Sequence, residues 1–385
     1  MLTYHTVIIG GGASGLFCAG SFDKPKLILE HNKRPGAKVR VSGGGKCNFT
    51  HTPLSAADYV CSQKHFCKNA LAAFKPQDFT TLLQAADVDY ETRPDGCLFA
   101  QRAGDIADFL ERRARQAHSD FSLDTQALGL EKTDDGFFVC TSAGTIQAQQ
   151  VVLACGGLSY PKLGSSSFGI KVARQFDLNI VEQRPALCGL TVQKPLRAVC
   201  KALAGNSTPV QIRTGEQSAT GPLLFTHEGF SGPAVLDISL YWKEGSPVTI
   251  NFLPEIDVRA LLAAHKQENK RISSVIDLPG HIAAQLLGNN DAVLANATKL
   301  QLETAARLLN GFTFIPVGTS GYIKAEVTAG GVDVREINPS TFEVKKVPGL
   351  YVIGELLDVT GKVGGYNLHW AWASGYCAAQ HLAKK

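Results

Sequence analysis

The stretch Thr6-Val-Ile-Ile-Gly-Gly-Gly-Ala-Ser-Gly-Leu-Phe-Cys-Ala19 joins an apolar run, a glycine turn and a helix-forming segment. Its β-branched start, Val7–Ile9, is typical of a strand covered on both faces. Gly10, Gly12 and Gly15 have G-x-G-x-x-G spacing. In that spacing the first glycine permits a tight turn, the second lets backbone approach a pyrophosphate, and the third allows close helix–strand packing. The free N–H groups of the following helix would face the phosphates.

An acidic residue follows at the distance that this motif requires. Glu30 ends the apolar segment Lys26–Glu30, roughly twenty residues after the glycine turn. A carboxylate there can accept hydrogen bonds from both ribose hydroxyls, whereas a 2′-phosphate would be repelled. Strand, turn, helix and acid together predict dinucleotide binding on a parallel sheet. The alternative is a glycine turn with an incidental surface glutamate.

Length and composition indicate a globular protein of two or three structural units. The chain has 385 residues, 44% of them hydrophobic, and no apolar run approaches the roughly 18 residues of a membrane span. Because the N-terminus runs directly into the first strand, we expect no signal peptide. The ten cysteines form no C-x-x-C pair, so neither a metal site nor a disulfide framework is expected. Reduced thiols favour a cytoplasmic location.

Charge is uneven along the chain although the net charge is only +4. The segment 31–57 contains no acid, which suits a pyrophosphate bound beside it. A second acid-free segment, 183–215, holds Arg184, Lys194, Arg197, Lys201 and Arg213. The stretch Arg184–Arg213 could therefore contact an anionic substrate or a nucleic-acid backbone. The alternative is a solvated basic face.

Four further glycine-containing landmarks resemble ligand-facing turns. Ser42-Gly-Gly-Gly-Lys-Cys-Asn48 predicts a second cradling loop, since three glycines permit positive φ and close backbone approach. The apolar strand in 150–157 ends in a double glycine, and 349–358 is a similar strand that ends in glycine and acids. The loop 362–368 then enters a C-terminal helix, whose first N–H groups would again face a ligand.

Composition changes divide the chain into three parts. We expect a discontinuous dinucleotide-binding domain from 1–187 and 329–385, a β-barrel-like domain from 188–254 and 311–328, and a helical insertion at 255–310. Within these parts, the pattern predicts a helix over Val258–Asn269 and a strand over Tyr322–Thr328.

Taken together, these motifs resemble the BaiN/YhiN/RdsA-like FAD-dependent oxidoreductases. Phe225-Thr-His-Glu-Gly-Phe-Ser-Gly-Pro233 and Thr328-Ala-Gly-Gly-Val332 add to the resemblance, which spans nearly the whole chain. It implies an α/β fold, with a glutathione-reductase-like FAD-binding Rossmann domain, an inserted β-barrel-like domain and a helical subdomain. This chain departs from the family pattern at Lys46, Cys155 and Phe168, where the family usually has Arg, Thr and Asp. The third departure puts in doubt a polar role for that loop.

The resemblance also implies a set of FAD contacts, in which Ala127 would meet the adenine through its backbone. They lie in the pyrophosphate turn, around the ribose acid, in the second glycine loop, on the adenosine side and at the flavin end. These residues are Gly10, Gly12, Ala13, Ser14, Gly15, Glu30, His31, Lys38, Arg40, Ser42, Gly43, Gly44, Gly45, Lys46, Cys47, Asn48, Ala127, Ala154, Cys155, Gly156, Gly157, Gly354, Glu355, Asp358, Gly364, Gly365, Tyr366, Asn367 and Leu368.

The expected reaction is reduction of a C=C bond conjugated to a carbonyl, with electrons from NAD(P)H that docks transiently, because a second dinucleotide motif is lacking. Uridine in ribosomal RNA is a candidate substrate, since the resemblance includes such reductions and the basic stretch suits a polyanion. The alternatives are an amine oxidase of the aminoacetone-oxidase type and a nucleic-acid-binding protein with redox-silent FAD. His227, Cys47 and Tyr366 are candidate proton donors, although a histidine in such a turn often makes only a local hydrogen bond. The oligomeric state stays open.

Overall fold

The computed structural model describes residues 2–385, which form two compact units. The first unit comprises Met1–Pro185 and Glu326–Lys385, and the second comprises Ala186–Ala325. Each unit has its own cluster of buried hydrophobic residues. The segment predicted as helical, 255–310, falls within the second unit, and so does the segment predicted as β-barrel-like except for residues 326–328, which belong to the first unit. Among residues 2–385, every helix is too short or too polar to span a bilayer.

The first unit is built on a seven-stranded sheet in the order β7-β2-β1-β10-β9-β8, with β20 also pairing β10. Strands β7, β2, β1, β10 and β20 run parallel to their neighbours, whereas β8, β9 and β10 form an antiparallel meander. The strands are β1 (Leu2–Ile9), β2 (Lys26–Leu29), β7 (Ser119–Ser122), β8 (Ala127–Thr133), β9 (Gly136–Thr141), β10 (Gly144–Leu153) and β20 (Leu350–Val352).

The register of this sheet brings four strand ends level. Ile9 pairs with Leu29 on one side and with Leu153 on the other, and Leu153 pairs with Val352. The turns that follow these strands therefore meet at one edge, which we call the carboxyl edge. Ligands of open α/β sheets bind outside this edge.

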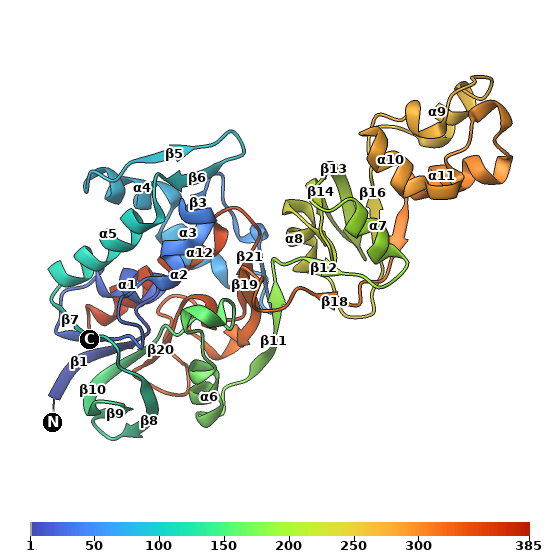
Figure 1. Ribbon diagram of the computed structural model, residues 1–385. Helices are drawn as coiled ribbons and strands as arrows, with labels where there is room; N and C mark the ends of the chain where they lie inside the picture. Colours follow the sequence, from blue (N-terminus) through green and yellow to red (C-terminus); the bar gives the residue numbers. More distant parts are fainter. Residues whose placement is uncertain (1) are drawn as a thin grey trace. The chain divides into compact units, whose positions relative to one another are not determined.

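Helices cover this sheet, and the C-terminal helix packs against the first helix of the chain. Helix α12 lies beside α1 in Figure 1, and Trp372 of α12 packs 5.6 Å from Phe17 of α1 between ring centroids. Pro76 at the first turn of α4 and Asp78, whose carboxylate accepts from the Lys75 N–H, explain where that helix begins. The helices are α1 (Ala13–Ala19), α2 (Ala37–Val41), α3 (Cys67–Ala73), α4 (Pro76–Gln84), α5 (Ala103–Gln116), α6 (Phe168–Gln175) and α12 (Tyr366–Leu382).

Three small sheets complete the first unit and tie distant segments together. Strand β11 pairs with β19, β4 pairs with β21, and β6 lies between β3 and β5. Their bounds are β3 (Asn48–His51), β4 (Tyr59–Cys61), β5 (Tyr90–Thr92), β6 (Cys97–Ala100), β11 (Ile180–Ala186), β19 (Val327–Val332) and β21 (Val359–Gly361).

The second unit contains a seven-stranded antiparallel sheet in the order β17-β16-β13-β14-β15-β12-β18. Buried and exposed residues alternate strictly along β13, as expected for a sheet with one face in the core. The elements are β12 (Leu190–Thr191), β13 (Ser207–Thr214), β14 (Gln217–Phe225), β15 (Gly229–Ser231), β16 (Val248–Asn251), β17 (Phe312–Phe314), β18 (Gly318–Thr319), α7 (Leu196–Ala202), α8 (Pro233–Ser239), α9 (Val258–Ala264), α10 (Gly280–Leu287) and α11 (Lys299–Asn310).

Two predicted element boundaries in or next to this unit are wrong. The helix expected over Val258–Asn269 ends at Ala264, because the polar segment after it brings no apolar residue to the core-facing positions. The strand expected over Tyr322–Thr328 begins only at Val327. The N–H groups of Lys324 and Ala325 donate to the Gly321 carbonyl, which makes a turn of the preceding residues.

Candidate functional site

At the first glycine turn, beside the carboxyl edge, neighbouring backbone leaves no room for a side chain on Gly10 or Gly15. Gly10 has φ +113°, and a Cβ there would lie 2.4 Å from the Ala154 carbonyl oxygen. A Cβ on Gly15 would lie 2.0 Å from the Gly10 oxygen. At Gly12, by contrast, no atom lies within 4 Å of the Cβ position. Gly10 and Gly15 are therefore required by packing, whereas Gly12 borders open space at the start of α1.

Glu30 lies directly beside this turn. Its side chain is 7% exposed, and its carboxylate accepts hydrogen bonds from the Gly11 N–H at 2.9 Å and the Asn32 N–H at 2.8 Å. His31, which is more exposed, approaches the same carboxylate at 3.3 Å. The backbone thus holds the acid at the level of the glycine turn, as ribose recognition requires.

The second glycine loop adopts a conformation that glycine favours. Gly43, Gly44 and Gly45 all have positive φ, of 57°, 65° and 89°. Nothing lies within 4 Å of a Cβ placed at Gly44 or Gly45, and the same holds at Gly156 after β10. Glycines with this much space around the Cβ position also occur in exposed hairpin turns of this chain. Gly44, Gly45 and Gly156 differ from them because they belong to loops next to the carboxyl edge.

The C-terminal segment closes the same region through Glu355. One carboxylate oxygen pairs with Lys38 Nζ at 2.8 Å, and the other accepts from the Thr328 N–H at 2.8 Å. Gly354 leaves no room for a side chain, since a Cβ would lie 2.5 Å from Ser14 Oγ in α1. Residues from both ends of the sequence therefore meet at the carboxyl edge.

Asn48 connects the second glycine loop to the start of α12. Its side-chain amide donates to the Thr50 and Leu98 carbonyls and accepts from the Gly365 N–H at 3.3 Å. Gly364 and Gly365 have φ of +121° and +91°, and α12 begins at Tyr366. This places the N-terminus of a 17-residue helix, with its partial positive charge, beside the loop.

Asn367 and Asp358 hold the neighbouring backbone. The Asn367 amide bonds to both the N–H and the carbonyl of Gly361. Asp358 is buried and accepts from the Ser62 N–H at 2.9 Å, and burial raises the pKa of its carboxyl group. These two residues shape the loop before α12.

Several residues of the implied set lie apart from this arrangement or make other contacts. Arg40 pairs with Asp108 of α5 at 2.7 Å. Ala127 sits at the start of β8 opposite Thr141. Lys46 is exposed, and burial raises the pKa of the Cys155 thiol to about 12. Ser42 donates its hydroxyl to the Val39 carbonyl at 2.7 Å. Ala13, Gly157 and Leu368 occupy the start of α1, the turn after β10 and the first turn of α12.

The candidate proton donors have very different surroundings. Cys47 is completely buried, and burial raises the pKa of its thiol to about 12. The Tyr366 ring is 7% exposed and stacks on His51, with centroids 4.6 Å apart. His227 is exposed in the turn between β14 and β15 of the second unit.

The sequence reasoning missed a polar cluster beside Tyr366. His51 Nδ1 donates to the Gly364 carbonyl at 3.2 Å and lies 3.6 Å from Cys97 Sγ. The pairing of β3 with β6 brings these two residues together across 46 positions of sequence. No spacing signal in the sequence could have revealed that pair.

Comparison with solved structures identifies the fold. The chain aligns over 100% of its length with quinol fumarate reductase FrdA from E. coli, with a TM-score of 0.53 and 16% identity over 71% of that chain. It also aligns over 100% of its length with 3-ketosteroid delta1-dehydrogenase from Sterolibacterium denitrificans, with a TM-score of 0.52 and 14% identity over 100% of that chain.

The fold and its glycine-lined edge define an FAD-dependent oxidoreductase. A family model described as "HI0933-like protein Rossmann domain" matches residues 4–381, and the chain belongs to this family.

Curated relatives match over nearly their full length. The chain is 39% identical to the ribosomal RNA dihydrouridine synthase of Escherichia coli K12, over 99% of this chain and 98% of the relative. It is 34% identical to the Haemophilus influenzae protein of the same name, over 99% of both chains. It is 31% identical to the 3-dehydro-bile acid delta(4,6)-reductase of Clostridium scindens, over 98% of both.

Proposed function

We propose that this protein uses FAD to reduce the C=C bond of a uridine ring in ribosomal RNA, giving dihydrouridine. The observation that supports this most is the full-length similarity to two proteins named for that reaction, combined with the glycine-lined carboxyl edge. A third relative is named as a reductase of a different substrate, so C=C reduction is common to the relatives while the substrate varies.

The described residues fit an FAD molecule along the carboxyl edge. The open space at Gly12 and the N–H groups of α1 would receive the pyrophosphate, and Glu30 would bind the adenosine ribose. The open glycines of the second loop, Gly44 and Gly45, leave room for the ribityl and flavin portion. When bound, FAD supplies the capacity to accept two electrons and pass them on as a hydride.

The N-terminal end of α12 would supply positive electrostatic potential to a bound flavin. The N–H groups of its first turn and the Gly364–Gly365 turn carry partial positive charge, which would stabilise negative charge gathered on a neighbouring ring. Uridine reduction adds one hydride and one proton across the double bond. Cys47 is completely buried, Tyr366 is nearly so, and His227 is exposed in the second unit, so all three remain candidate proton sources.

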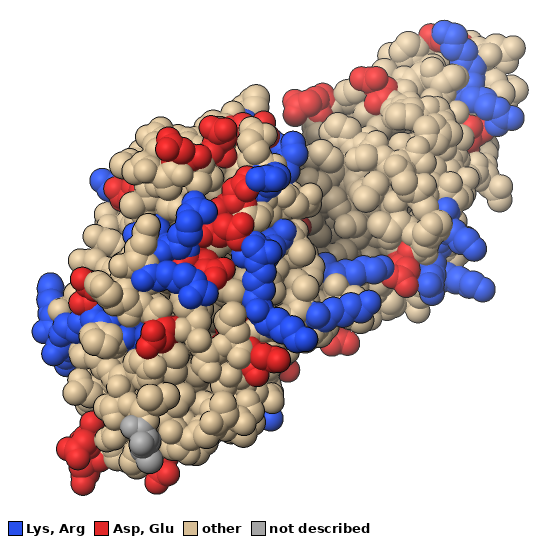
Figure 2. Space-filling view, turned by 60° about the vertical axis from the view of Figure 1, so that its left-hand side comes forward, with Lys and Arg blue, Asp and Glu red and all other residues tan. Residues whose placement is uncertain are grey.

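Recognition of RNA would use basic residues of the second unit. Lys194, Arg197 and Lys201 are all exposed, and Arg197 and Lys201 lie four residues apart on α7, hence on one face. Arg184 belongs to the first unit, whereas the other basic residues of the stretch Arg184–Arg213 belong to the second. Figure 2 shows Lys and Arg side chains interspersed with Asp and Glu, which favours localised phosphate contacts over a uniformly cationic face.

The test is conversion of uridine in unmodified ribosomal RNA by the purified, FAD-containing protein. We expect oligonucleotide mass spectrometry to show a gain of two hydrogen atoms at a uridine, with stoichiometric oxidation of NADH or NADPH. Flavin that is bleached without any modified RNA would contradict the proposed substrate. Oxygen consumption with aminoacetone would instead support the amine-oxidase alternative, and flavin that neither nucleotide bleaches would support a redox-silent role.

A further inference from the structure

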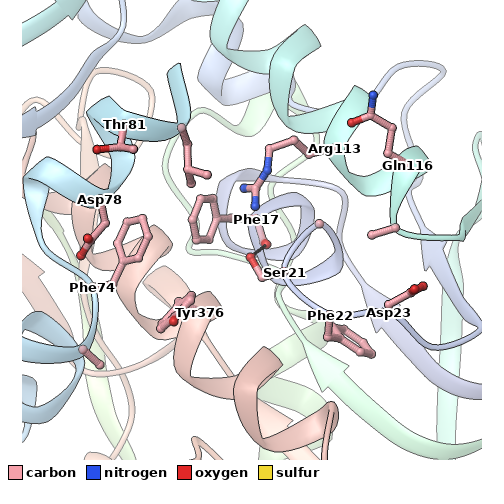
Figure 3. Close-up of a pocket in the computed structure, with 14 residues that line it drawn as sticks. Phe17, Ser21, Phe22, Asp23, Phe74, Asp78, Thr81, Arg113, Gln116 and Tyr376 are labelled. Atoms are coloured by element: carbon pink, nitrogen blue, oxygen red, sulfur yellow. Dashed lines mark hydrogen bonds between the residues drawn. The ribbon is translucent and has the colours of Figure 1, made fainter. Parts of the chain in front are cut away.

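A second concave site lies in the first unit, at the opposite end of α1 from Gly12. The pocket has a volume of about 740 Å³, within the range of small-molecule sites. Its walls come from the end of α1, from α3 and α4, from α5 and from α12 (Figure 3). Because α1 has only seven residues, about 10 Å of helix separates this pocket from the glycine turn.

One wall of the pocket is aromatic. The rings of Phe17 and Phe74 lie 4.9 Å apart between centroids, and those of Phe74 and Tyr376 lie 5.2 Å apart. Phe22 adds a further ring from the segment after α1. Phe17 is completely buried and Phe74 is 3% exposed, so these rings lie behind the surface, and Tyr376, of intermediate exposure, is the ring against which a planar ligand can stack.

The pocket also contains a cation without a counter-ion. Arg113 reaches from α5 over Phe17 towards Ser21 in Figure 3. Among residues 2–385, its guanidinium makes no ion pair, and its Nη1 atom is shielded from solvent without a hydrogen-bond partner. Burial lowers the pKa of Arg113, in agreement with a poorly solvated charge. Such a group gains most from an anion that brings its own acceptor oxygens.

The carboxylates in the lining are engaged elsewhere. Asp23 accepts from His118 Nδ1 at 2.6 Å, and Asp78 accepts from the Lys75 N–H at 2.6 Å as the N-terminal cap of α4. Neither pairs with Arg113. The guanidinium therefore remains available to a ligand, and the helix terminus offsets the charge of Asp78.

We propose that this pocket binds a planar aromatic carboxylate, with its carboxylate on Arg113 and its ring against Tyr376, which packs on Phe74 behind it. This site is separate from the FAD-binding edge and does not depend on the proposed substrate.

The test compares binding of 2-naphthoate and neutral 2-naphthamide to the full-length, FAD-containing protein by isothermal titration calorimetry. The two probes share a ring system, so a difference between them reports the charge. We expect 2-naphthoate to bind at least about tenfold more tightly, as a charge-assisted hydrogen bond implies. Arg113→Met keeps the aliphatic stem and should abolish this preference. Arg112→Met, the same change at the exposed neighbouring position, should retain it.

A second variant keeps the test decisive should Arg113→Met unfold. Thr81 lines the pocket from an exposed position of α4, so Thr81→Trp should fill the mouth, leave the fold intact and weaken both probes. Equal affinity of the wild-type protein for the two probes would overturn the proposal. So would a preference that survives Arg113→Met, or binding that is unchanged in a folded Thr81→Trp variant.

Discussion

The two units use glycine and strand patterns in different ways. In the first unit, Gly10, Gly15 and Gly354 sit where a Cβ would collide with another segment at the carboxyl edge. In the second unit, Gly229 and Gly232 are also crowded, but by neighbouring strands of the antiparallel sheet: a Cβ would lie 2.2 Å from the Leu190 oxygen and 2.7 Å from the Pro222 oxygen. Close backbone approach in the first unit therefore surrounds the carboxyl edge, where ligands of such sheets bind. In the second unit it serves the packing of the sheet itself, and β13 alternates buried and exposed residues.

The sharpest test of this contrast exchanges one hydrogen for a methyl group in each unit. In Gly15→Ala, the Cβ would lie 2.0 Å from the Gly10 oxygen, so we expect loss of about 3 kcal/mol or more of stability and a protein devoid of flavin. In Gly280→Ala, no atom lies within 4 Å of the Cβ, and α10 should be unharmed. Visible absorbance measures the flavin content of the two variants, and thermal melting measures their stability. Normal flavin content in Gly15→Ala would refute the packing argument.

A pH titration probes the buried polar contacts that α12 makes in the first unit. His369 is completely buried, and its Nε2–H donates to the Phe74 carbonyl while Nδ1 accepts from the Thr50 hydroxyl. Burial lowers its pKa from 6.5 to about 4. The unfolded chain therefore binds more protons between these values, and stability falls as pH drops from about 6.5 to about 4, by roughly 3 kcal/mol.

Urea unfolding of the wild type and of His369→Gln at pH 7 and pH 4.5 measures this contribution. The variant should be less stable at pH 7 and should lose less stability on acidification. An identical pH dependence in both proteins would show that His369 does not carry the effect.

The ribose contact can be tested with a matched pair of amide substitutions. Glu30→Gln retains the shape of the side chain but removes the charge that accepts from the Gly11 N–H, so we expect FAD affinity to fall by about 2 kcal/mol. Glu228→Gln, at an exposed position of the second unit, should leave FAD affinity unchanged. Flavin fluorescence during reconstitution measures both. Equal affinities in the two variants would argue against Glu30 as the ribose acceptor.

The smallest expected effect concerns RNA binding by the second unit. Replacing Lys194, Arg197 and Lys201 by Ala should weaken ribosomal RNA binding by about tenfold and reduce the salt slope by about 2. The control replaces three exposed basic residues of α9 and α11 by Ala, and it should change neither the RNA affinity nor the salt slope. These residues are Arg259, Lys299 and Arg307. Filter binding at several salt concentrations measures the RNA affinity and the salt slope of both triple variants. Flavin content should be normal in both variants. An equal loss of RNA affinity in the two would indicate non-specific electrostatic attraction.

The ease of prediction differed from one part of the chain to another. The strand, glycine turn and acid around Gly10 and Glu30 are recognisable because each residue type answers a local steric or electrostatic need. Boundaries in and next to the second unit were wrong at Ala264 and Val327, since polar runs and turns there depend on which carbonyl captures which N–H. The contact residues implied for the flavin, and the three proton-donor candidates, remain predictions.

The sequence by itself determined the dinucleotide-binding class of fold, because a glycine turn between buried strand and helix leaves a local signature that few other folds share, and the resemblance of its motifs to a known family implied FAD. Only the tertiary structure decided which distant residues meet. The contact of Lys38 with Glu355, the pairing of His51 with Cys97 and the unpaired Arg113 over Phe17 all join segments from different parts of the chain. Such contacts follow from strand register and helix packing, which no spacing along a single chain encodes.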